Sequence, residues 1–213
     1  MKKIILLLIT LCLFTGSMCY VNAMCSKLIG KVIVIDVGHG GKDSGTVYNN
    51  VKEKDLNLAI ALKLQKELIK NGVEVIMVRE GDYDLSYPGA MRRKKSDFDN
   101  RIELINNSSA DMYLSIHINY LDNSKYYGAQ VFYTEDNKKI ADSIQNVFNE
   151  DLKSPLKSRK LGDDIYMYKK LDVPGVLIEC GFLSNYLERN KLQDDRYQDK
   201  IVDCIIKGLI NFY

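Results

Sequence analysis

Two histidines, His39 and His117, are the only imidazoles in the 213-residue chain. Each comes where a predicted buried strand ends, and open α/β sheets bind ligands at those strand ends. His39 lies in the glycine-rich segment GHGG (residues 38–41), where missing side chains let the backbone approach a bound group. In a strand, Ser115, His117 and Asn119 would share one face, forming a polar stripe that a structural core would avoid. This pattern favours ligand binding over a structural role.

Two acidic residues lie at comparable positions. Glu53 precedes a predicted helix, where a carboxylate also gains from the helix dipole, so its spacing alone leaves a helix-start charge and a ligand both open. Glu179 ends the apolar run VLIE (residues 176–179). Burial of an unpaired carboxylate is costly, so we expect Glu179 to face a cation, a partner or a cleft.

Together these four residues contain the minimum set for a catalytic zinc site. Two neutral imidazoles and one carboxylate can hold Zn²⁺ and leave a fourth position for water. A further acid beside the metal can act as the general base. The chain has no His-Glu-x-x-His helix, which excludes the thermolysin type of arrangement.

Alternating strand and helix patterns must position these residues. Apolar, β-branched runs predict strands, and apolar residues at helical spacing predict helices. The predicted strands are 31–37, 73–78, 112–116, 130–133 and 176–178, the helices are 55–71, 98–107, 138–148 and 198–212, and residues 81–97 are a predicted surface loop. This order predicts a single α/β domain with a mostly parallel, twisted sheet and helices on both faces.

The amino terminus has the order of a secretory signal. Lys2 and Lys3 precede an apolar run that is too short to span a membrane, so we expect residues 1–23 to be removed after Ala23 and residues 24–213 to form the catalytic domain. Retention of the segment as an anchor is the alternative, and a lipid on Cys19 or Cys25 is a minor one. The protein would act outside the cytoplasmic membrane, in the cell wall or spore cortex region.

The remaining composition excludes some classes of protein. Without its signal the chain has 28 basic and 28 acidic residues, so nothing favours nucleic acid as a partner. Three cysteines then remain, an odd number that implies no disulfide framework.

Four motifs in order resemble those of the zinc-dependent N-acetylmuramoyl-L-alanine amidases, the amidase-3 family. They are VIDVGHGGKDSG (residues 34–45), Glu53 with Asn57, SIHIN (115–119) and VLIECGFLSN (176–185), and the resemblance covers residues 31–213. It implies that His39, Glu53 and His117 hold Zn²⁺ and that Glu179 is the catalytic acid and base. It also implies supporting roles for Arg101 and Asn119.

The resemblance further implies a substrate. Enzymes of this family cut the amide bond between N-acetylmuramic acid and L-alanine, so the partners would be the glycan strand and stem peptide of peptidoglycan. The compact length is most similar to the germination-specific (CwlD-type) members, which act on spore cortex. Because the sequence shows no wall-binding module, we expect an exported companion protein or a surface loop to supply that contact.

Two other functions compete with this interpretation. A cysteine hydrolase would use Cys180 with a histidine, but strand alternation points Cys180 away from Glu179, and a free cysteine is more often a small buried hydrophobe. A wall-binding protein without turnover is the second alternative, although a binder has no use for a base beside the metal.

Overall fold

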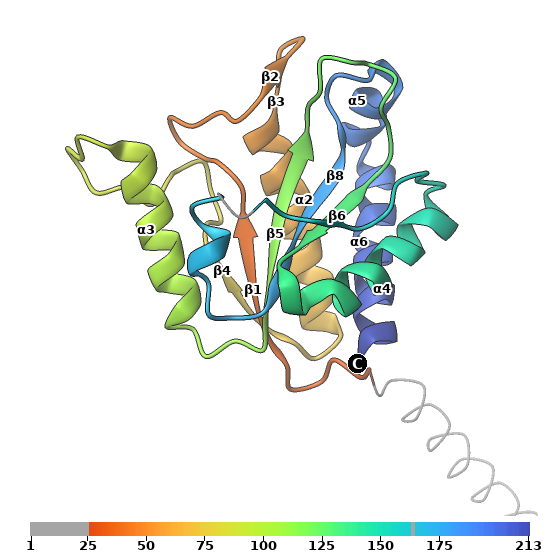
Figure 1. The fold of residues 1–213 in the computed structure, drawn as a ribbon, viewed down its shortest axis with the longest axis horizontal. Coiled ribbons are helices and arrows are strands. Elements are labelled where there is room, and N and C mark those ends of the chain that lie inside the picture. Colours follow the sequence, from red (N-terminus) through yellow and green to blue (C-terminus); the bar gives the residue numbers. More distant parts are fainter. Residues whose placement is uncertain (1–25, 163–164) are drawn as a thin grey trace, which may run out of the picture.

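A six-stranded sheet forms the centre of the structure, a computed structural model that describes residues 26–162 and 165–213 (Figure 1). In spatial order its strands are β4 (Glu74–Met77), β1 (Val32–Val37), β5 (Met112–Asn119), β8 (Gly175–Phe182), β6 (Gln130–Tyr133) and β7 (Arg159–Lys160). The first four are parallel to one another, while β6 is antiparallel to β8 and parallel to β7. The predicted α/β fold with a mostly parallel sheet is confirmed.

One face of the sheet is entirely apolar. Alternate residues of each central strand point to it, as Ile33 and Ile35 do in β1, and Val176 and Ile178 in β8. Three helices cover this face: α2 (Glu53–Lys70), α4 (Lys138–Asp151) and α6 (Asp195–Phe212). Asp194 begins α6 by accepting hydrogen bonds from the backbone N–H groups of Arg196 and Tyr197. This face is the structural core.

The opposite face is apolar only in part. Val34, Tyr113 and Leu177 pack there with Ile105 of α3 (Arg93–Asn106), which lies apart from the other three long helices (Figure 1). A short 3₁₀ turn, η2 (Tyr168–Lys170), also contributes to this cluster. Helices therefore lie on both faces, as predicted, but α3 leaves the carboxyl ends of the central strands open.

Several boundaries differ from the prediction. Strand β5 continues through Asn119, so the prediction that His117 lies beyond a strand end is wrong; the strand continues because Ile116 and Ile118 still pack into the core. Strand β8 continues to Phe182 for the same reason. Helix α3 begins at Arg93, which shortens the predicted loop 81–97.

Short elements were not predicted at all. They are the hairpin of β2 (Val47–Tyr48) and β3 (Val51–Lys52), strand β7, the 3₁₀ turns η1 (Glu135–Asn137) and η2, and helix α5 (Tyr186–Leu192). Except for the seven residues of α5, these elements have two or three residues, which are too few to show a period. The predicted signal segment lies outside the described residues, and within the described ranges no helix is long and apolar enough to cross a membrane.

A buried ion-pair network lies between α3 and the carboxyl-terminal half of β1, on this second face of the sheet. The Nη1 atom of Arg101 lies 2.7 Å from Oδ1 of Asp36, and its Nε lies 3.0 Å from Oδ2 of Asp97. Burial alone would raise the pKa of Asp36, but the charge of Arg101 and a hydrogen bond from Ser115 bring it below its ordinary value. All three charged side chains are almost completely buried, so each depends on its partners.

We expect Asp36→Asn to lower the free energy of unfolding by about 3–5 kcal/mol, because the buried charge of Arg101 would then be balanced by Asp97 alone. Asp151→Asn is a matched control, since it removes the same charge from an exposed pair with Lys207 and should change stability by less than about 1 kcal/mol. Urea unfolding of the three proteins measures both values. Equal losses in the two variants would contradict the role given to the buried network.

Candidate metal centre and active site

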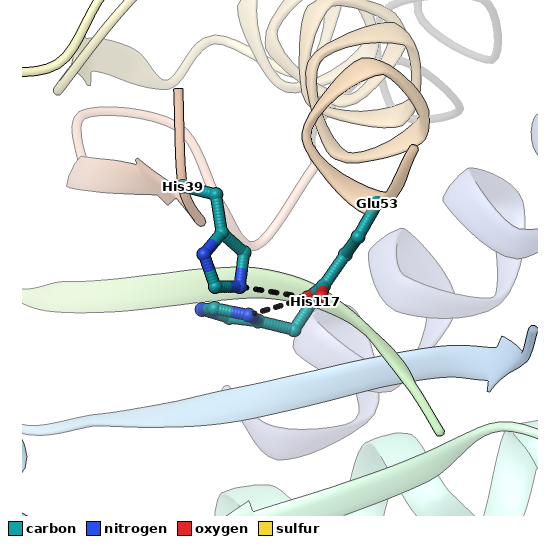
Figure 2. Close-up of side chains that lie close together, drawn as sticks. All are labelled: His39, Glu53 and His117. Carbon is teal, nitrogen blue, oxygen red and sulfur yellow. Dashed lines mark hydrogen bonds and ion pairs between the residues drawn. The ribbon is translucent and has the colours of Figure 1, made fainter. Parts of the chain in front are cut away.

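Three side chains from separate elements converge at the carboxyl end of the sheet (Figure 2). His39 follows β1 by two residues, Glu53 is the first residue of α2, and His117 lies in β5. Nε2 of His39 lies 3.1 Å, and Nδ1 of His117 lies 3.0 Å, from the same oxygen, Oε1 of Glu53. One ligand atom from each residue lies within 4.8 Å of the others. The structure thus brings together the three residues predicted to bind metal.

The backbone at His39 adopts an uncommon conformation. Its φ angle is 61°, in the left-handed region that non-glycine residues rarely occupy. The carbonyl oxygen of His39 accepts a hydrogen bond of 2.7 Å from Nη2 of Arg101. Its Nδ1 lies 3.0 Å from Oδ2 of Asp43, which leaves Nε2 facing Glu53. Asp43 was not singled out by sequence reasoning, although its spacing of four residues after His39 in a glycine-rich turn was a usable signal.

Glycines let the rings and the loop approach closely. A Cβ atom on Gly38 would lie 2.4 Å from the His117 ring. A Cβ atom on Gly45 would lie 2.6 Å from Oε2 of Glu53 and also from the His39 ring. The glycine-rich segment therefore makes room for the cluster itself, in addition to any bound group.

A second buried arginine, Arg79, also holds the backbone of this loop. Arg79 donates hydrogen bonds to the carbonyl oxygens of Val37, Gly38, Lys54 and Gly81, at 2.9 to 3.1 Å. Sequence reasoning missed Arg79, yet its position directly after an apolar strand is the same signal that identified Glu179.

The predicted supporting residues lie beside the cluster. Arg101 is beneath it and contacts the backbone of Val37 and His39. Asn119 is at the end of β5 and lines the cavity with His117 and Glu179. Their contribution to catalysis stays a prediction.

The electrostatics of the cluster favour a cation. Burial raises the pKa of Glu53, but hydrogen bonds with His117 and His39 outweigh this and hold it far below its ordinary range. Burial lowers the pKa of His39, while Asp43 and Glu53 raise it more strongly, to about 9. The carboxylates of Glu53 and Asp43 can therefore compensate the positive charge of a cation bound at this cluster.

Glu179 faces the same space from the adjacent strand. It is opposite His117 in the β5–β8 register, and its buried Oε2 has no hydrogen-bond partner. Burial, and secondarily the charge of Glu53, raise its pKa to about 8, although His39 lowers it somewhat. A carboxyl group in this state can both accept and donate a proton near neutral pH.

Cys180 points the other way, into the apolar core. Its side chain is completely buried, and burial raises the pKa of its thiol. A nucleophilic cysteine needs an accessible thiolate, so this geometry argues against the cysteine hydrolase.

Two hollows meet at the cluster. A cavity of about 630 Å³ extends over β8 and β6, and a groove of about 480 Å³ extends on the other side toward Thr46 and Tyr120. Both are lined by His39, His117, Asn119 and Glu179. A bound molecule larger than the cluster could therefore extend past these residues on either side.

Known proteins share this sequence and fold. Residues 33–211 match the family Amidase_3, described as N-acetylmuramoyl-L-alanine amidase. The chain is 40% identical over 192 residues to the germination-specific N-acetylmuramoyl-L-alanine amidase of Bacillus subtilis, a match that covers 87% of this chain and 81% of the relative.

Solved structures agree. The CwlD amidase from Clostridioides difficile, in complex with the GerS lipoprotein, is similar with a TM-score of 0.81 and 41% identity, over 86% of this chain and 98% of that one. The catalytic domain of CwlV from Bacillus (Paenibacillus) polymyxa has a TM-score of 0.73 and 30% identity, over 85% and 97% of the two chains. The chain belongs to the Amidase_3 family of N-acetylmuramoyl-L-alanine amidases, the enzymes that act on peptidoglycan.

Proposed function

We propose that this amidase works with one zinc ion held by His39, Glu53 and His117, and that Glu179 is its catalytic acid and base. One observation supports this most strongly: three donor atoms converge within 4.8 Å, and Glu179, which has a buried oxygen without a hydrogen-bond partner, lines the cavity beside the two histidines.

The donor set fits zinc. Two imidazole nitrogens and a carboxylate oxygen are a recurring catalytic zinc set that leaves one position open. Asp43 supports His39 from its other ring nitrogen, the second contact that metal-binding histidines usually make. The two imidazoles point at a single oxygen of Glu53, so one cation could bind all three donors at once.

Each residue then has a defined task in amide hydrolysis. Zinc at this site would supply Lewis-acid chemistry, polarising the scissile carbonyl and acidifying water. Glu179 takes a proton from the attacking water and passes it to the amide nitrogen as the carbon–nitrogen bond breaks. The products are a lactyl carboxylate on the glycan and a peptide with a free amino group. Arg101 keeps His39 in position through its carbonyl oxygen.

We propose spore cortex peptidoglycan as the substrate, with its glycan strand and stem peptide as binding partners. The supporting observation is the similarity to a germination-specific amidase. Cortex lies outside the cytoplasmic membrane, which is consistent with the export signal expected in residues 1–23, whether that signal is removed or retained as an anchor.

We also propose an exported companion protein. The supporting observation is that the similar amidase from C. difficile was solved in complex with the GerS lipoprotein. A companion would bring the catalytic domain to an insoluble substrate.

Replacing either histidine with alanine should remove bound zinc and amidase activity together, because two ligands remain where three are needed. Metal analysis and release of L-alanine amino groups from muropeptides measure the two effects. Asp43→Asn is the graded control, and should weaken zinc binding by about 10–100-fold while the ligands stay in place. Stoichiometric zinc in both histidine variants would refute the assignment.

Glu179→Gln should reduce turnover by about 10²–10⁴-fold, because glutamine keeps the shape but cannot take the proton. Zinc content should stay unchanged. Cys180→Ser tests the neighbouring residue on the opposite face, and should leave the rate within a few-fold. A fast Glu179→Gln enzyme, or a folded, zinc-loaded Cys180→Ser enzyme without activity, would overturn this mechanism.

The same glutamine variant has a second readout, in the metal-free protein. The folded-state pKa of Glu179, about 8, lies above its ordinary value of 4.5, so its contribution to stability is present below pH 4.5 and is lost as pH rises through about 8. Between pH 5 and 7, metal-free wild type should lose about 2 kcal/mol more stability than Glu179→Gln. Parallel pH profiles would show that Glu179 is not held as described.

The companion protein can be tested with two substrates. We expect the purified chain to digest intact sacculi more slowly than the same amount of chain in crude extract, while soluble muropeptides are cut equally fast by both. Release of amino groups measures each rate. Equal rates on sacculi would remove the need for a companion.

A further inference from the structure

The larger cavity follows one face of the sheet away from the metal cluster. Gln130 of β6 is opposite Glu179, and Phe132 is opposite Leu177 on one side and Arg159 of β7 on the other. Directly opposed residues point to the same face of a sheet, and all five side chains line the cavity. In Figure 1, β5, β8 and β6 lie side by side along this path. The cavity therefore leads from Glu179 to Arg159.

Of the two arginines that line this cavity, Arg159 is the one without a side-chain partner among the described residues. In the described part of the chain its exposed side chain makes no hydrogen bond or ion pair. The other arginine that lines the cavity, Arg101, is buried and is paired with Asp36 and Asp97. Lys94 lines the smaller groove and lies 3.7 Å from Asp43. An anion entering the larger cavity would thus meet Arg159.

The walls beside Arg159 are apolar, and Leu156, Leu161 and Ile165 form part of them. Arg159 itself is exposed, so such walls shield one side of its ion pair from water and strengthen it modestly. They also suit the short aliphatic side chains of a small peptide better than a sugar, whose many hydroxyl groups would lose their hydration. The cavity therefore suits a short peptide with a negatively charged group.

Distances agree with a short peptide. Two strand steps of about 4.8 Å and two residues along the strand separate the Cα atoms of Glu179 and Arg159 by about 12 Å. Two extended residues span about 7 Å, and the long arginine side chain reaches over the rest. A carboxylate on the second residue after the scissile amide would lie within reach of the guanidinium.

We infer that Arg159 binds the free α-carboxylate of the second stem residue, a glutamate joined through its γ-carboxyl group, and so selects substrates in which this carboxylate is not amidated. This inference rests on the proposed function. A guanidinium gives a carboxylate two parallel hydrogen bonds, whereas a carboxamide has no charge and only one acceptor oxygen. The stem peptide then lies across β8, β6 and β7.

The orientation of the glycan follows. The lactyl side of the scissile bond points into the smaller groove, whose lining includes Thr46, Lys94, Asn119 and Tyr120. These polar and amphipathic side chains can pair with sugar hydroxyl groups. The two hollows therefore divide the substrate, with peptide on one side of Glu179 and glycan on the other.

Two soluble substrates test the inference: N-acetylmuramoyl dipeptides whose second residue carries either the α-carboxylate or the α-carboxamide. Arg159→Met should lower kcat/KM for the carboxylate by about 5–20-fold, mainly through KM, because an exposed charged hydrogen-bonded pair contributes modestly. The carboxamide should change by less than about twofold. Arg159→Lys should recover part of the loss. Lys157→Met is the matched control, since it removes an exposed charge from the same segment without lining the cavity.

Binding is measured separately in zinc-loaded Glu179→Gln protein by titration calorimetry, where adding Arg159→Met should raise Kd for the carboxylate substrate by the same factor. Equal losses on both substrates, or no loss on either, would overturn the inference. So would a change in affinity for a peptide-free glycan fragment, because that result puts the glycan in this cavity. If wild type cleaves neither substrate, it is the proposed function that fails.

Discussion

The ion pair between Asp36 and Arg101 is the interaction on which the site depends. A carboxylate in the middle of a buried sheet is tolerated only with a fully bonded partner, and Arg101 supplies it from helix α3. The same guanidinium donates to the carbonyl oxygens of Val37 and His39. The arginine that compensates the buried charge of Asp36 therefore also fixes the backbone at His39. The left-handed conformation of His39 is held by the bond from Arg101 to its carbonyl oxygen and by the contact of its ring with Asp43.

Much of the candidate site could be predicted because successive side chains of a strand point to opposite faces of the sheet. The chain has two histidines, and Glu179 interrupts an apolar run, so residue type and a period of two already separated the chemical face from the core. The structure agrees at Cys180, which packs into the core while its neighbour Glu179 faces the cavity. The fold class followed from the order of long apolar runs, whose helices and strands are each long enough to show a period.

What could not be predicted depends on contacts between distant segments. Arg79 binds the carbonyl oxygen of Val37 across 42 residues of sequence, and local pattern contains no information about that pairing. The start of α3 was missed because residues 93–97 are almost all polar and show no apolar repeat. Strand β7 has two residues, and its place beside β6 follows from tertiary packing alone. For this reason the cavity that leads to Arg159 could be found only in the structure and not from the sequence.

The contact between Gly38 and the His117 ring has an evolutionary consequence. The space that a larger residue at position 38 needs already contains the imidazole, and position 45 is blocked in the same way by Glu53 and His39. A larger residue at either position would therefore require a change in the side chain that already occupies that space. Positions 38 and 45 are therefore constrained by the cluster itself, whereas Leu156 and Ile165 lie in the walls of the larger cavity.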